Sequence, residues 1–106
     1  QKTFLDTAKS GVTMTYDNKR TAILMEAADL INNSRAQEYG PPETNFARIA
    51  AGWSVILGDV DVTAEQVSLC MAWLKIARIA GDGQASRDSF TDAAAYMALA
   101  GELADV

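Results

Sequence analysis

The chain has 106 residues and a formal net charge of −5, with 49% hydrophobic and 22% charged residues. This length suits one domain, the apolar content argues against disorder, and the acidic balance argues against nucleic acid as the main partner. The absence of histidine excludes histidine-based catalytic triads, histidine zinc sites and an imidazole general base. Any acid–base or metal chemistry must therefore use carboxylates, lysine, tyrosine or water.

The first predicted helix follows an irregular stretch of the chain. Residues 1–17 have only scattered apolar side chains and are expected to form an N-terminal arm, ahead of a helical domain at 18–106. The helix begins near Asp17 or Asn18, because either side chain can cap a helix N-terminus. Its apolar stripe has helical spacing, with Ile23, Ala27, Leu30 and Ile31 on one side.

A strong helix breaker, Gly40-Pro41-Pro42, separates the first helix from the second. Pro42 suits the first turn of a helix, where its missing N–H costs nothing, and Gly58 suits the position just after its end. Between them, the residues predicted to form the inward stripe are Phe46, Ile49, Ala50, Trp53, Ile56 and Leu57. We expect Trp53, like Trp73 further on, to lie in the core or at an interface rather than to stack on a ligand.

Two further helices complete an all-α fold, predicted as a compact four-helix bundle. The segment from Thr63 to Gln66 has the form of a capping box, with Val62 placed for a hydrophobic staple. The helix at 63–80 is apolar on most sides, which predicts that it is the central one. The last helix is expected from Ser86 or Asp88 to about Ala104, with Phe90, Ala93, Ala94, Met97 and Ala100 facing inward.

Cys70 is the only cysteine, so no internal disulfide can form and we expect a reducing, cytoplasmic compartment. Its apolar neighbours favour a small core residue over a nucleophile. No apolar stretch reaches the roughly 18 residues that cross a bilayer, so no membrane partner is expected. A domain of this size leaves much surface uncovered, and we therefore expect a homo-oligomer.

Lys75 and Arg78 form a cationic edge on the otherwise apolar third helix. Burying an unpaired charge costs several kcal/mol by any estimate, so these groups need acidic partners, water or a bound anion. One interpretation is that both side chains extend to solvent at the edge of the bundle. The other is that they bind phosphate oxygens.

Two pairs of carboxylates stand on the outer helices. Asp88 and Asp92 lie four residues apart, with Asp92 on the same line as Tyr96, Leu99 and Leu103. They suit a shared divalent cation such as Mg²⁺, or alternatively a helix-dipole contact for Asp88 and a salt bridge from Asp92 to Lys75 or Arg78. Glu26 and Asp29 form the second pair, which on its own suits an ordinary exposed face. Together, the two pairs predict a magnesium cleft facing the cations.

The segment between the first two helices supplies further polar groups. Arg35, Tyr39 and Asn45 offer hydrogen-bond donors and one aromatic face near a helix N-terminus. Such an end attracts anions. It is a natural place for an anion or a nucleotide base, and if the ligand is a nucleotide these three residues would contact its base or sugar.

The order Arg35-x-x-x-Tyr39-Gly40, Asn45-Phe46, Trp53, Lys75-x-x-Arg78 and Asp88-x-x-x-Asp92-x-x-x-Tyr96 resembles an uncharacterised domain common in bacteriophage genomes, over roughly residues 22–104. More distantly, it is similar to MazG-like all-α nucleoside triphosphate pyrophosphohydrolases. That resemblance implies metal ligands at Glu26, Asp29, Asp88 and Asp92, catalytic roles for Glu26 and Asp92, and phosphate binding by Lys75 and Arg78. It also implies the host cytosol as the location if the chain is phage-encoded.

Two departures from the superfamily keep a second hypothesis open. The first helix carries fewer acids than usual, and the second pair is spaced by four residues rather than three. The first hypothesis is a Mg²⁺-dependent pyrophosphohydrolase that releases pyrophosphate and a nucleoside monophosphate. The second is a binding protein without turnover, which sequesters a nucleotide signal or inhibits a host defence protein. A third is a pure assembly role with intersubunit salt bridges.

Overall fold

All regular structure is helical in the computed structural model, which describes residues 18–34, 40–81 and 86–106. In chain order the elements are α2 (Lys19–Asp29), the π-helical turn η1 (Leu30–Ser34), α4 (Pro42–Ile56), α5 (Ala64–Gly81) and α6 (Arg87–Leu103). The all-α prediction is confirmed for these residues. The predicted arm at 1–17 lies outside them.

Short-range hydrogen bonds set the beginnings of the helices where the sequence predicts them. The side-chain oxygen of Asn18 accepts a hydrogen bond of 2.9 Å from the backbone N–H of Thr21. At the start of α5, the N–H of Thr63 donates to the Gln66 side chain at 3.0 Å, and the N–H of Gln66 donates to the Thr63 hydroxyl at 3.1 Å. These reciprocal bonds confirm the capping box. Pro42 is the first residue of α4, also as predicted.

The end of α4 is fixed by a glycine and by one side-chain hydroxyl. Gly58 has φ = +88°, a left-handed conformation that other residues rarely adopt, and its N–H donates to the carbonyl of Val55 at 3.1 Å. The Ser54 hydroxyl accepts a hydrogen bond of 2.9 Å from the N–H of Val62. The chain therefore turns back beside α4 before α5 begins.

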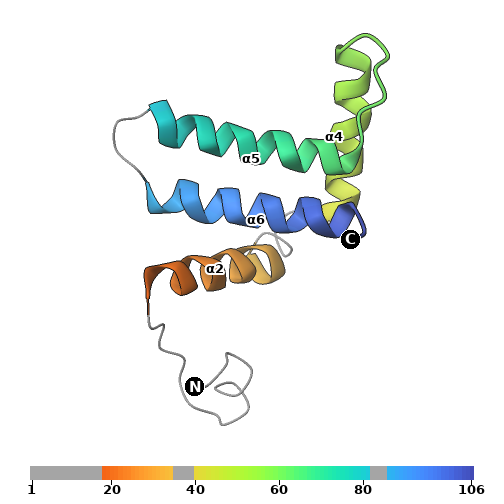
Figure 1. Ribbon diagram of the computed structural model, residues 1–106. Helices are drawn as coiled ribbons and strands as arrows, with labels where there is room; N and C mark the ends of the chain where they lie inside the picture. The colour runs from red at the N-terminus through yellow and green to blue at the C-terminus, as the bar shows by residue number, and fades with distance from the viewer. Residues whose placement is uncertain (1–17, 35–39, 82–85) are drawn as a thin grey trace.

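Figure 1 shows α5, α6 and α2 side by side, with α4 crossing near one end of this layer. Helix α6 lies in the middle and packs against both α5 and α2, whereas α4 packs mainly against α5. The prediction that the third helix is central is therefore confirmed only in part, because α5 packs against both α4 and α6 but lies at the edge of the layer. Helix α5 is apolar on most sides because it buries one side and leaves a second apolar side exposed, as described below.

The core is small and lies where α4 crosses α5 and α6. The buried cluster consists of Phe46, Ala50, Val67 and Leu99, and half-buried Trp53 packs against it. Ser68 is completely buried beside Val67, and its hydroxyl donates a 2.7 Å hydrogen bond to the backbone carbonyl of Tyr96. This bond satisfies a buried hydroxyl and joins α5 to α6.

Several apolar side chains do not lie where the sequence predicts. Of the residues expected to face inward from α6, Phe90 and Met97 are 42% and 51% exposed, and Ala100 alone is fully buried. Cys70 is exposed rather than part of the core. At the end of α4, Ile56 and Leu57 are exposed because that part of the helix extends past α5 (Figure 1). Within the described ranges, no helix combines the length and the apolar character that a membrane span needs.

Candidate functional site

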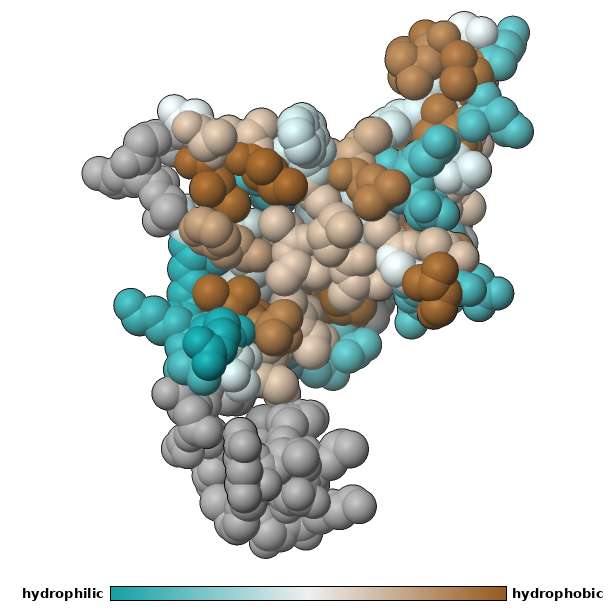
Figure 2. Space-filling model, in the orientation of Figure 1, coloured by the Kyte–Doolittle hydropathy of each residue, from teal (hydrophilic) through white to brown (hydrophobic). Residues whose placement is uncertain are grey.

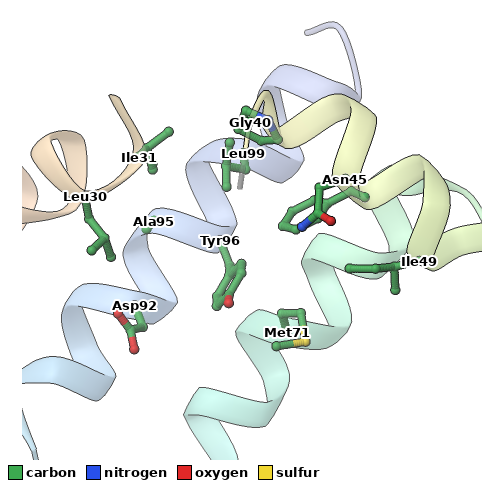
Figure 3. Close-up of a pocket in the computed structure, with 12 residues that line it drawn as sticks. Leu30, Ile31, Gly40, Asn45, Ile49, Met71, Asp92, Ala95, Tyr96 and Leu99 are labelled. Atoms are coloured by element: carbon green, nitrogen blue, oxygen red, sulfur yellow. The ribbon is translucent and has the colours of Figure 1, made fainter. Parts of the chain in front are cut away.

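A pocket of about 280 Å³ opens where the end of α2 and its π-helical turn approach α4, α5 and α6. Most of its wall is apolar, as in pockets that bind small organic ligands. Figure 3 shows side chains from all of these elements around one space. The residues that line it are Leu30, Ile31, Gly40, Pro42, Asn45, Phe46, Ile49, Met71, Asp92, Ala95, Tyr96 and Leu99.

Three of the lining residues bring polar groups to this apolar space. Asn45 comes from the first turns of α4, and Asp92 and Tyr96 come from successive turns of α6. The Tyr96 ring stacks on that of Phe46, with centroids 6.2 Å apart and planes inclined by 28°. This contact and the Ser68 hydrogen bond to the Tyr96 carbonyl hold the aromatic wall in place.

Asp92 is the charged member of the pocket, and it is paired with a cation from α5. The Lys75 ammonium lies 3.0 Å from a carboxylate oxygen of Asp92, and the two side chains are only 15% and 20% exposed. The salt bridge considered from the sequence is therefore present, with Lys75 as the partner. It places a positive charge beside a pocket in which Asp92 is the only charged residue of the described lining.

Glu26, on α2, is engaged in a different contact. Arg87 donates two hydrogen bonds to its carboxylate, at 2.8 and 3.1 Å, and the Thr91 hydroxyl donates a third at 3.4 Å. The hydrogen bond from Arg87 holds the pKa of Glu26 below its ordinary value and raises the pKa of Arg87. This pair joins α2 to the beginning of α6, and its side chains are nearly half exposed.

The remaining predicted ligands on the described helices are exposed. Asp29 accepts a 2.7 Å hydrogen bond from the side chain of Asn33, and with Glu26 it lines a separate, shallow hollow of about 460 Å³. Asp88 lies in the first turn of α6, where a negative charge favours the helix dipole. Arg78 lies in the last turn of α5, where a positive charge does the same.

The two acidic pairs are thus not brought together. In residues 18–34, 40–81 and 86–106, no three carboxylate or thiol groups gather as they would around a metal ion. Asp92 faces Lys75, Glu26 faces Arg87, and Asp29 and Asp88 are exposed. As they lie in this structure, these four carboxylates do not form one magnesium cluster. Magnesium binding by the protein stays a prediction.

Of the predicted substrate contacts, the structure places Asn45 in the pocket and Lys75 next to it through Asp92. Arg35 and Tyr39 lie outside the described residues. The sequence interpretation missed the pairing of Arg87 with Glu26, because 61 residues separate them. It did single out Tyr96, which shares a helical line with Asp92.

Comparison with known proteins gives a family. The sequence model of a domain of unknown function, DUF6378, matches residues 22–104. The chain belongs to this family. Its extent agrees with the resemblance to an uncharacterised phage domain noted from the sequence.

Two relatives come from mycobacteriophages. The chain is 40% identical over 75 residues to the Gene 55 protein of Mycobacterium phage L5, and 43% identical over 75 residues to the Gene 55 protein of phage D29. The matched part covers 71% of this chain but 47% and 48% of the relatives, so the chain spans about half of their length. No solved structure matches. The similarity to MazG-like enzymes stays a prediction.

Proposed function

We propose that the pocket binds a nucleotide or a nucleotide-derived ligand, with the base against Tyr96 and Phe46. The observation that supports this is an apolar, partly aromatic space with three polar groups on its wall and a lysine ammonium 3.0 Å from one of them. Its volume of about 280 Å³ is near the lower limit of roughly 300 Å³ for ligand pockets, which suits a base with its sugar.

Each polar group has a role in this proposal. The Asn45 amide both donates and accepts hydrogen bonds, which suits the edge of a base. The Asp92 carboxylate accepts from an amino or a hydroxyl group of the ligand. Lys75, which is bound to Asp92 in the free protein, then neutralises a phosphate oxygen.

Binding without turnover is favoured over hydrolysis by where the acids lie. A pyrophosphohydrolase needs several carboxylates around its metal and triphosphate, whereas Asp92 is the only acid among the described residues that line this pocket. A domain that binds but does not cleave a nucleotide would sequester it, for example as a signal. Hydrolysis with Mg²⁺ remains the second hypothesis, and the same protein samples test it.

The first experiment measures the melting temperature and calorimetric binding of the chain with nucleoside mono-, di- and triphosphates, each with and without Mg²⁺. At least one nucleotide should raise the melting temperature. Asn45→Ala should weaken its binding tenfold or more, while Asn32→Ala, an exposed asparagine on η1, should leave it within twofold. If no nucleotide binds, the proposal is wrong, and a host protein becomes the favoured partner.

The second experiment measures pyrophosphate released from bound triphosphates in the presence of Mg²⁺. The binding hypothesis predicts no release. It also predicts that Asp88→Asn leaves affinity unchanged, because Asp88 is exposed and does not line the pocket. Release that falls with both Asp88→Asn and Asp92→Asn would instead support a catalytic metal site with these ligands.

A further inference from the structure

The second apolar side of α5 continues onto α6, and within residues 18–34, 40–81 and 86–106 no element covers it. It is formed by five large side chains, called here the outer face: Leu69 (39% exposed), Trp73 (69%), Ile76 (42%), Phe90 (42%) and Met97 (51%). Leu69, Trp73 and Ile76 follow helical spacing on α5, and Phe90 and Met97 lie two turns apart on α6. Figure 2 shows mainly brown and tan atoms over the region that α5 and α6 occupy in Figure 1.

The outer face contains no charged side chain. Between Gln66 and Ala77 the only charged residue of α5 is Lys75, and between Ser89 and Gly101 the only charged residue of α6 is Asp92. These two side chains are paired with each other and largely buried. A second surface can therefore cover the outer face without leaving a charge buried and unpaired.

The exposed apolar area is also comparable to the largest patch on a typical soluble monomer, which is roughly 300–600 Å² and often functional. With roughly 200 Å² for each fully exposed large side chain, the five residues present roughly 500 Å². A standard interface buries roughly 800 Å² on each partner. The exposed alanines Ala77, Ala80 and Ala98 of the same two helices, together with half-buried Ala94, can supply part of the remainder.

We propose that the outer face binds a second copy of this chain, so that two antiparallel α5–α6 pairs form a four-helix bundle around a two-fold axis. A helix layer that is covered on one side needs another layer on its other side, and two helix pairs packed face to face are a common solution. Each chain has a net charge of −5, so two copies repel each other least where they meet through an uncharged surface. The dimer does not depend on what the pocket binds.

The test compares two substitutions of the same kind in the full chain. Light scattering after size exclusion should give the wild type twice the 11.3 kDa mass of one chain. Ile76→Glu, on the outer face, should give a monomer with unchanged helical circular dichroism. Ile56→Glu, on the 80% exposed side chain at the end of α4, should remain a dimer.

A second variant on the other helix protects the test against misfolding. Met97→Glu should also give a folded monomer, because Met97 is half exposed on α6. Three results would overturn the proposal: a wild type that is monomeric up to about 200 µM, well above the micromolar Kd of weak standard-size interfaces; a dimer broken by Ile56→Glu but not by Ile76→Glu; or a monomer whose Trp73 is shielded from iodide quenching by another part of the same chain.

Discussion

The two sides of the α5–α6 pair are built from the same helices but differ in almost every other respect. On the pocket side, Lys75 pairs with Asp92, and the Ser68 hydroxyl is hydrogen-bonded to the Tyr96 carbonyl. The outer face has larger apolar side chains, no charge and no cover from the described part of the chain. The polar groups are therefore on the side that is packed, and the most apolar stripe is on the side that is open.

This difference shows why hydrophobicity alone does not identify the inward side of a helix. A stripe of large apolar residues can pack equally well in the core of its own chain or in an interface with another chain. A paired lysine and aspartate with low exposure, in contrast, need packed neighbours, and Asp92 has them among the residues that line the pocket. Each prediction below changes one side and asks whether the other side responds.

The largest effect is expected from two phenylalanines on opposite sides. Phe46→Ala should lower the free energy of unfolding by about 3–5 kcal/mol at any protein concentration, because the buried ring stacks on Tyr96 in the core. Phe90→Ala should cost less than about 1 kcal/mol at concentrations where the chain is monomeric, and more where it is a dimer. Urea unfolding over a range of concentrations measures both. Equal losses in dilute protein would show that the two sides do not differ in this way.

The next effect concerns the charged pair on the pocket side. Asp92→Leu and Lys75→Met should each lower the free energy of unfolding by about 1–3 kcal/mol, because each leaves a poorly solvated charge without its partner. The double variant should be more stable than either single variant, since no lone charge remains. A thermodynamic cycle from urea unfolding measures the coupling. A double variant whose loss equals the sum of the single losses would mean that the two residues act independently.

Local features of this fold were predictable from the sequence, whereas packing directions were not. The Asn18 cap, the Thr63–Gln66 capping box and the Pro42 start all depend on groups no more than three residues apart or on one fixed backbone angle. The contact of Glu26 with Arg87, and the outward direction of Phe90, depend on where whole helices lie. The candidate site was predictable in part for the same reason. Helical spacing places Asp92 and Tyr96 on one side of α6, but it does not tell which residues of η1, α4 and α5 lie opposite them.

A smaller effect is expected at the capping box, which lies at the N-terminus of α5 and belongs neither to the pocket side nor to the outer face. Thr63→Ala should lower the free energy of unfolding by about 1 kcal/mol, because the N–H of Gln66 loses its acceptor. The change should be the same in monomer and dimer, since it acts on the helix end and not on either face. Thr44→Ala, at an exposed position in the first turn of α4, is the matched control and should stay within about 0.5 kcal/mol. A dependence on protein concentration would place the box at the interface.

The smallest effect is expected at the exposed pair between α2 and α6, and it should depend on pH. Because Arg87 keeps the pKa of Glu26 below the ordinary 4.5, the folded state binds a proton at this group less readily than the unfolded state. The pair therefore contributes its full stability above pH 4.5 and loses it as the pH falls below that value through the folded pKa. Glu26→Gln should be slightly less stable than wild type at pH 7, and the difference should close at pH 3.

Two controls make this measurement specific to the pair. Glu102→Gln removes one negative charge from an exposed position on α6, the helix that carries Arg87. It should not reproduce the pH-dependent difference. Sodium chloride at 1 M should reduce the effect of Glu26→Gln at pH 7, because nearly half-exposed charges are screened. Salt should change the effect of Asp92→Leu much less, since that pair is largely buried. If salt weakens both effects equally, the Lys75–Asp92 pair is more solvated than its exposure indicates. The charges of the covered part and of the open part of the molecule would then not differ in their screening by solvent.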